Sequence, residues 1–269
     1  MSAAPVECIA RYVFEGAVHV GRIDGEFLLR LDAPPWLHGR ATGARDPLAR
    51  VRLLPPCVPT KIVCVGLNYR AHIAESQSVV PGATPPVEPL LFLKPPSAVI
   101  ASGEPIVYPP GVTRLDPEGE LAIVIARRTR HVSESDAMAA VAGLTCFNDV
   151  SARNYQKTDG QWTRAKGFDT FAPLGPWIAV GLSPDDLAIE CRVNGAVRQR
   201  ARTADLLFAV PRLIAHISRI MTLEPGDVIA TGTPAGIAPV EPGDLIEIEV
   251  EGVGTLANRV AAASESGAA

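Results

Sequence analysis

The sequence has few cysteines, and none stands in a pattern typical of a zinc site or a disulfide framework. Its 269 residues include five cysteines, an odd number, with no C-x-x-C pair among them. Its first residues do not have the pattern of a secretory leader, so we expect none. We therefore expect reduced thiols and a cytoplasmic protein. The cysteines are Cys8, Cys57, Cys64, Cys146 and Cys191.

The sequence also lacks a long apolar run and an excess of positive charge. A membrane-spanning helix needs about 20 consecutive, mostly apolar residues, and no stretch approaches that length. The formal net charge of -4 at pH 7 leaves no basic footprint for nucleic acid. Neither a membrane nor a nucleic acid is therefore an expected partner, and an anionic substrate would have to be met by local positive charge.

The remaining composition describes a globular protein. Hydrophobic residues make up 47% and charged residues 20%, and the length allows a large core. Short β-type segments separated by X-Gly turns predict an antiparallel meander near the start of the chain, at 8–14, 17–23 and 26–31. The proline-rich stretch 55–59 then stiffens the chain. We predict a small N-terminal β domain (1–58), a main domain (59–262) and a flexible tail (263–269).

Strands also dominate the main domain. Apolar runs bounded by turn residues predict them, and Asn194-Gly195 is a strong hairpin signal. One amphipathic helix is predicted over 211–221, with proline in its first turn, and a short one over 137–142. The predicted strands are 61–66, 90–93, 121–125, 144–149, 174–180, the hairpin 187–200, 228–234, 245–250 and 254–260.

Three carboxylates lie beside two of these strands. Glu118 and Glu120 precede an apolar run and are two residues apart, so on a strand they share one face. Asp149 stands at the end of another buried strand. Two like charges held close together need a cation, although an isolated Glu-x-Glu is more often a solvated acidic turn.

A histidine and a glutamate are predicted to share one short helix. With Asn68 as the expected N-cap, His72 and Glu75 stand three residues apart, within hydrogen-bonding reach. The loop 76–89 is rich in proline, glycine and serine, which would tether this helix loosely, as in a lid. The alternative is an ordinary surface His-Glu pair.

A dense group of cations and amides follows Asp149. Aromatic side chains are interleaved with it, which indicates that the segment packs against something, although a solvated loop is the alternative. The group consists of Arg153, Asn154, Gln156, Lys157, Arg164 and Lys166.

Taken together, these motifs closely resemble the fumarylacetoacetate hydrolase family, collinearly from about Lys61 to Val260. The N-terminal meander resembles the small extra domain of many bacterial members. The motifs are Gly66-Leu-Asn-Tyr-x-x-His72-x-x-Glu75, Leu91-Phe-Leu-Lys-Pro95, Glu118-Gly-Glu120-Leu, Asn148-Asp-Val-Ser-Ala-Arg153-x-x-Gln156, Trp162-Thr-x-Ala-Lys166 and Thr231-Gly-Thr-Pro234.

The resemblance implies a β-rich α+β fold, with a rolled mixed sheet in the main domain, and a homodimer. It implies that Glu118, Glu120 and Asp149 bind Mg²⁺ or Mn²⁺, which agrees with the preference of hard cations for oxygen ligands. It also implies a small anionic 2-oxo acid as substrate.

The resemblance further implies roles for the remaining site residues. Lys166 adds positive charge at a developing enolate, and His72, oriented by Glu75, activates water. Substrate-binding roles fall to Arg153, Gln156 and Thr233, the last of which would bind a carboxylate or carbonyl oxygen.

The function that the resemblance implies first is metal-dependent hydrolysis of a C–C bond in an acylpyruvate-type 2,4-dioxo acid. Decarboxylation of a 2-oxo acid such as oxaloacetate, or isomerisation of a 2-hydroxyhepta-2,4-diene-1,7-dioate in aromatic catabolism, is the alternative within this fold. A non-catalytic binding protein is a remote alternative, because three unneutralised carboxylates are costly to keep without a metal.

Overall fold

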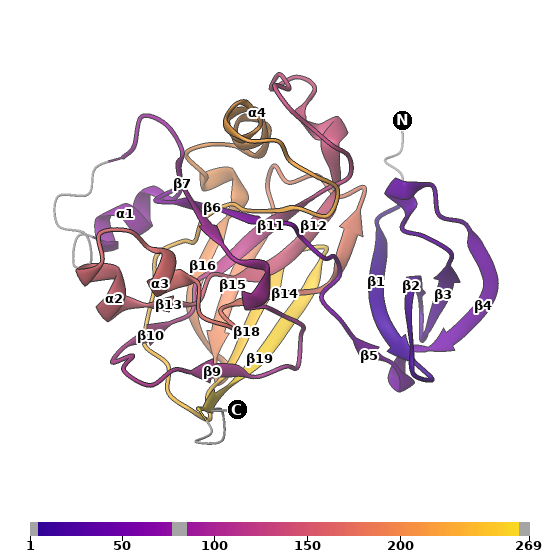
Figure 1. The fold of residues 1–269 in the computed structure, drawn as a ribbon, viewed down its shortest axis with the longest axis horizontal. Coiled ribbons are helices and arrows are strands. Elements are labelled where there is room, and N and C mark those ends of the chain that lie inside the picture. The colour runs from indigo at the N-terminus through magenta and orange to yellow at the C-terminus, as the bar shows by residue number, and fades with distance from the viewer. Residues whose placement is uncertain (1–4, 77–84, 264–269) are drawn as a thin grey trace.

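The computed structural model describes residues 5–76 and 85–263. It confirms a β-rich fold of mixed sheets with short helices (Figure 1). Residues 264–269 of the predicted tail lie outside the described part of the chain.

Four antiparallel strands form the N-terminal meander, and a short fifth strand pairs with the first (Figure 1). Three of the four coincide with predicted segments. The fourth lies in a stretch for which no strand was predicted, because its residues are mostly exposed and show no apolar alternation. The strands are β1 (Glu7–Phe14), β2 (Ala17–Asp24), β3 (Phe27–Leu31), β4 (Ala41–Pro47) and β5 (Arg52–Leu53).

The meander continues into a sheet of the main part of the chain. The further strands of this sheet are β6 (Ile62–Gly66), β7 (Leu90–Lys94), β8 (Val99–Ile100), β11 (Gly119–Ile125), β12 (Val141–Asn148), β14 (Ala172–Val180) and β17 (Val228–Ala230). Their order is β4-β3-β2-β1-β14-β12-β11-β17-β6-β7, with β5 on β1 and β8 on β14. Because β6 runs parallel to β17 and β8 parallel to β14, the twelve-stranded sheet is mixed.

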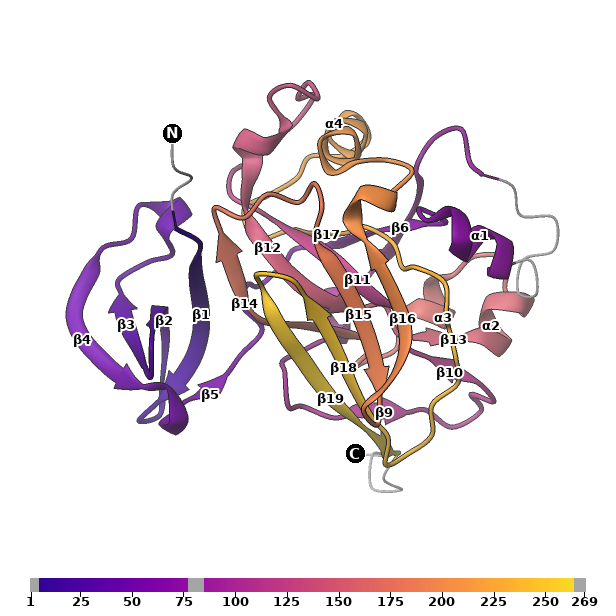
Figure 2. The ribbon, with the colours of Figure 1, turned by 180° about the vertical axis from the view of Figure 1, so that it is seen from behind.

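A five-stranded sheet packs against the centre of the first (Figure 2). Its order is β16-β15-β18-β19-β9, and the Asn194-Gly195 turn closes the hairpin of β15 and β16 as predicted. The strands are β9 (Ile106–Tyr108), β15 (Ala188–Val193), β16 (Ala196–Arg202), β18 (Leu245–Val250) and β19 (Gly254–Ala262).

The central strand β11 is buried on both faces. Leu121 and Ile123 pack in one core cluster with side chains of the five-stranded sheet, such as Ile248. Ala122 and Val124 point to the opposite face and join a second cluster. This double burial explains the continuous apolar run in the sequence and holds the start of β11 rigidly.

Helices are short and lie mostly at one end of the main sheet (Figure 1). The segment 153–166, in which no helix was predicted, contains two of them, and the helix predicted over 137–142 is only a 3-10 turn (Ala137–Ala140). No helix of the described residues is long and apolar enough to cross a membrane. The helices are α1 (Arg70–Ser76), α2 (Arg153–Thr158), α3 (Thr163–Lys166) and α4 (Val210–Ile220), with further 3-10 turns at Pro35–Leu37, Leu48–Arg50, Pro96–Ala98 and Thr203–Asp205 and a two-stranded sheet of β10 (Leu115–Asp116) and β13 (Ser151–Ala152).

A buried aspartate ties the linker after the meander to the core. Asp227 accepts hydrogen bonds from Thr60 N (3.0 Å), Thr60 Oγ1 (2.7 Å), Lys61 N (3.1 Å) and Glu224 N (2.7 Å), and pairs with the Lys61 ammonium. Burial alone would raise the pKa of Asp227, but the Lys61 ammonium and these donors hold it below its ordinary value.

Asp227→Asn is expected to lower the free energy of unfolding by about 2–4 kcal/mol at neutral pH, because it removes one partner of a buried ion pair. A depressed carboxyl pKa adds stability above the unfolded-state pKa, and this is lost as the pH falls through the folded-state pKa. The difference from wild type in urea unfolding should therefore shrink as the pH falls below about 4, the ordinary pKa of an aspartate. The control is Asp24→Asn, which breaks only the exposed pair with Arg45; an equal loss in both variants would contradict the assignment.

Candidate active site

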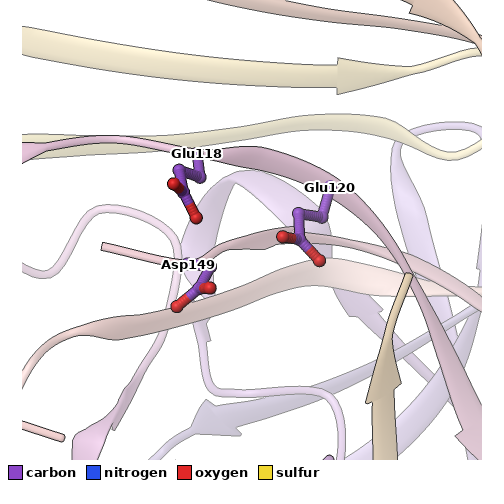
Figure 3. A group of neighbouring side chains, drawn as sticks. All are labelled: Glu118, Glu120 and Asp149. Atoms are coloured by element: carbon purple, nitrogen blue, oxygen red, sulfur yellow. The ribbon is translucent and has the colours of Figure 1, made fainter. Parts of the chain in front are cut away.

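The three predicted carboxylates converge at one end of the β11–β12 pair. Because the two strands are antiparallel, with Gly119 opposite Asn148, the start of β11 meets the end of β12. Glu118, Glu120 and Asp149 each offer an oxygen within 4.8 Å of the others, and all three are buried. Figure 3 shows their carboxyl groups facing a common space.

Two hydrogen bonds donated by backbone N–H groups hold this junction in place. Glu118 N donates to Asn148 Oδ1 (3.0 Å), and Asp149 N donates to the carbonyl oxygen of Glu118 (2.9 Å). The carboxylate positions are therefore set by the strand pairing and do not depend on a flexible loop.

Two buried lysines contact these carboxylates. Lys166 Nζ lies 2.7 Å from Glu118 Oε2 and 2.6 Å from Asp149 Oδ2, while Lys94 Nζ lies 2.5 Å from Asp149 Oδ1. Burial lowers the pKa of Lys94. Burial acts in the same direction on Lys166, but the charges of Asp149 and Glu118 outweigh it and raise the Lys166 pKa. The two carboxylates thus favour the charged form of Lys166 at the site.

Lys94 was not among the predicted site residues. The signal that could have found it is its place at the end of an apolar strand, in the motif Leu91-Phe-Leu-Lys-Pro95. A lysine that is itself buried needs a counter-charge, and here that charge is Asp149.

Arg153 connects Glu118 to a further buried acid, Asp116. Its Nη2 donates to Glu118 Oε1 (2.5 Å), its Nε to Asp116 Oδ2 (2.8 Å) and its Nη1 to Gln156 Oε1 (2.8 Å). Arg114 binds Asp116 in a bidentate manner, with both distances 2.9 Å. Burial alone would raise the pKa of Glu118, but Arg153 and then Lys166 hold it well below its ordinary value.

Glu120 has a different environment. Gly232 N donates to its Oε2 (2.7 Å), and no hydrogen bond or ion pair from a cationic side chain reaches it among the described residues. Burial, and then the negative charges of Asp149 and Glu118, raise the pKa of Glu120 well above its ordinary value. An all-oxygen, buried donor set that includes one carboxylate with so little compensating positive charge fits a hard divalent cation.

His72 and Glu75 lie on α1 as predicted, with His72 Nδ1 3.5 Å from Glu75 Oε2. Glu75 also accepts hydrogen bonds from Gly236 N (3.1 and 3.0 Å to its two oxygens) and Ile237 N (3.4 Å). Burial alone would raise the Glu75 pKa, but the neighbouring His72 and these backbone donors lower it. Glu75 thus connects the histidine to the segment after Pro234.

The prediction that Asn68 caps this helix is wrong. Its Oδ1 accepts from Phe208 N (2.9 Å) and its Nδ2 donates to Thr231 O (2.7 Å), so a buried tertiary contact uses the groups a cap would need. The expected lid loop begins at residue 76, but residues 77–84 lie outside the described part of the chain.

Thr233 borders the pocket into which the three carboxylates face. Its hydroxyl donates to Gly119 O (3.0 Å) and accepts from Gln199 Nε2 (2.7 Å). Every predicted site residue except Glu75 lines this pocket. Glu75 contacts His72 instead. The pocket is lined by Val65, Gly66, Leu67, His72, Phe92, Glu118, Glu120, Asp149, Arg153, Gln156, Trp162, Lys166 and Thr233.

Comparison with known proteins places this arrangement in a family. A family model described as Fumarylacetoacetate (FAA) hydrolase C-terminal matches residues 61–261, and one described as Rv2993c-like, N-terminal matches residues 9–56. The mitochondrial oxaloacetate tautomerase Fahd2a of Rattus norvegicus is 38% identical over 250 residues, covering 87% of this chain and 78% of the relative.

Two solved structures are similar along nearly the whole chain. The 2-hydroxyhepta-2,4-diene-1,7-dioate isomerase from Mycobacterium marinum has 42% identity and a TM-score of 0.89, covering 96% of this chain and 100% of that one. The maleylpyruvate hydrolase from Sphingobium sp. SYK-6, in complex with manganese(II) ion and pyruvate, has 32% identity and a TM-score of 0.77 over the same shares. The chain therefore belongs to the fumarylacetoacetate hydrolase family of enzymes.

Proposed function

We propose that this protein catalyses divalent-metal-dependent hydrolysis of a C–C bond in an acylpyruvate-type 2,4-dioxo acid. The observation that carries the proposal is the placement of His72, beside Glu75, in the pocket that holds the three carboxylates. A base next to a cation-binding group is what attack by water on such a substrate needs.

Glu118, Glu120 and Asp149 would hold the cation, Mg²⁺ or Mn²⁺. The manganese(II) and pyruvate bound to the maleylpyruvate hydrolase support this choice. When bound, the cation polarises the 2-oxo group and offsets the negative charge that develops on its oxygen.

The chain's own residues supply the remaining steps. Arg153 and Gln156 border the pocket and would orient the anionic substrate. His72 takes a proton from water as the water oxygen bonds to the C4 carbonyl carbon, and the C3–C4 bond then breaks with its electron pair moving toward C3 and the 2-oxo oxygen. Lys166 offsets that charge. The proton held by His72 returns to C3, giving pyruvate and a second carboxylic acid.

A second candidate moves a proton without adding water. The oxaloacetate tautomerase and the diene-dioate isomerase among the similar proteins favour it. In this reaction His72 would transfer a proton between C3 and the 2-oxo oxygen. Decarboxylation of oxaloacetate would likewise need the charge stabilisation at the 2-oxo oxygen but no attacking water.

Product analysis in ¹⁸O-labelled water separates these reactions. The Mg²⁺-loaded protein is incubated with an acylpyruvate, with oxaloacetate and with a hydroxymuconate analogue, and each product is identified by mass spectrometry. Hydrolysis predicts pyruvate and one ¹⁸O atom in the new carboxyl group of the second acid. An unchanged acylpyruvate together with rapid enol–keto exchange of oxaloacetate would overturn the hydrolase assignment in favour of the second candidate.

A further inference from the structure

A glutamine outside the predicted site residues connects two parts of the pocket. Gln199 lies on β16 of the five-stranded sheet and is 1% exposed. Its Oε1 accepts from Gly119 N (2.9 Å), and its Nε2 donates to Thr233 Oγ1 (2.7 Å) and Pro234 O (2.8 Å). One side chain thus contacts both the residue between Glu118 and Glu120 and the Thr233 segment.

The absence of a side chain at residue 119 permits this close approach. A Cβ there would lie 3.1 Å from Cys191 Cβ and 3.5 Å from Gln199 Oε1. The first distance is tighter than ordinary van der Waals contact. Glycine at residue 119 therefore lets β11 pack closely against the five-stranded sheet where Gln199 reaches it.

The partners of Gln199 fix the orientation of its amide. A backbone N–H can only donate and a backbone carbonyl can only accept. Oε1 must therefore face Gly119 N, and Nε2 must face Pro234 O. With Nε2 donating to it, the Thr233 hydroxyl acts as an acceptor toward Gln199 and donates its own proton to Gly119 O at 3.0 Å.

A hydroxyl group has one proton and two lone pairs. At Thr233 the proton and one lone pair are used inside the protein, so one lone pair is left, and Thr233 borders the pocket. A ligand oxygen that only accepts, such as a carboxylate or a ketone, would compete with Gly119 O for the proton. A ligand hydroxyl can donate without breaking any of these bonds.

We propose that Gln199 is a positioning residue that sets the Thr233 hydroxyl as an acceptor toward the pocket, so that the site favours a ligand with a hydroxyl donor there. This revises the expectation that the hydroxyl binds a carboxylate or carbonyl oxygen. Resting on the proposed function, the inference identifies the enol form of a 2-oxo acid as the ligand class favoured at this point.

Two acids of equal carbon number provide the test. Glycolate carries a hydroxyl donor beside its carboxylate, whereas oxalate at neutral pH has only acceptors. Calorimetry with saturating Mg²⁺ gives both Kd values for wild type, Thr233→Val and Thr233→Ser. Thr233→Val should weaken glycolate binding about 3–10-fold, the usual effect of one hydrogen bond, and oxalate binding less than about 2-fold. Thr233→Ser, which keeps the hydroxyl, should resemble wild type.

Gln199→Met tests the positioning role, because methionine has a similar shape but no amide. The hydroxyl of Thr233 is then free to turn, and the preference for glycolate over oxalate should fall although Thr233 is intact. A merely structural role would lower Tm and weaken both acids alike, and that result would overturn the proposal. If Gln199→Met does not fold, Thr233→Val decides the question. An equal loss of affinity for glycolate and oxalate, or no loss for either, would overturn the proposal.

These binding ratios are measured without turnover and do not depend on which reaction follows. Failure of wild type to bind either acid would overturn the pocket as a 2-oxo acid site, and this inference with it. Normal wild-type binding with an unchanged ratio in the variants would overturn only the role given to Gln199 and Thr233.

Discussion

Glu120→Ala is expected to abolish measurable Mg²⁺ binding and activity while leaving the fold intact. Of the three carboxylates, Glu120 is the one whose charge is least compensated by the described residues. A bound cation should therefore be stabilised most by Glu120. Loss of one ligand from a set of three should weaken binding by at least about 100-fold, more than loss of an outer-shell partner does. Isothermal calorimetry with Mg²⁺ measures this directly.

The stability of the metal-free protein provides an independent readout. A carboxyl pKa raised by folding means that the ionised group destabilises the folded state at pH values above the unfolded-state pKa. Metal-free Glu120→Gln should therefore be at least as stable as wild type at neutral pH, yet gain no stability from added Mg²⁺. The control is the exposed Glu134→Ala. Unchanged Mg²⁺ affinity in Glu120→Ala would refute the ligand assignment.

His72→Ala is expected to lower kcat on an acylpyruvate by roughly 10²–10⁴-fold, the usual share of a general base. Oxalate binding with saturating Mg²⁺ should change little, because the carboxylates, Lys166 and Arg153 remain in place. The predicted effect is thus a loss of kcat at nearly constant affinity, which indicates an interaction made in the transition state.

His216→Ala supplies the matched control, since His216 lies on α4 and does not border the pocket. Near-wild-type kcat in His72→Ala would exclude His72 as the hydrolytic base. A smaller loss on oxaloacetate than on the acylpyruvate, with products identified for both, would indicate that proton transfer on oxaloacetate asks less of this residue.

Residue patterns were sufficient where the information is local. Because side chains alternate between the two faces of a strand, the pattern placed Glu118 and Glu120 on one face. Helical spacing placed Glu75 near His72. The apolar run 121–125 correctly predicted a buried strand. These relations hold because the geometry of one element fixes which of its own side chains are neighbours.

The errors occurred where tertiary contacts compete with local ones. Asn68 has the composition of a helix cap, but its side chain is used by Phe208 and Thr231. The strand β4 carries little apolar pattern because it lies at a sheet edge. For Asn68 the deciding partners are distant in sequence, and for β4 the sheet position decides.

The sequence by itself determined the family, the strand-rich architecture and the three carboxylates, because each is encoded in short motifs and in periodicity. Only the tertiary structure placed Lys94 on Asp149 and Gln199 between Gly119 and Thr233. These contacts join residues that are 34 to 80 positions apart in the sequence. The direction of a buried hydrogen bond depends on every donor and acceptor around it, and those groups become neighbours only when the two sheets pack together.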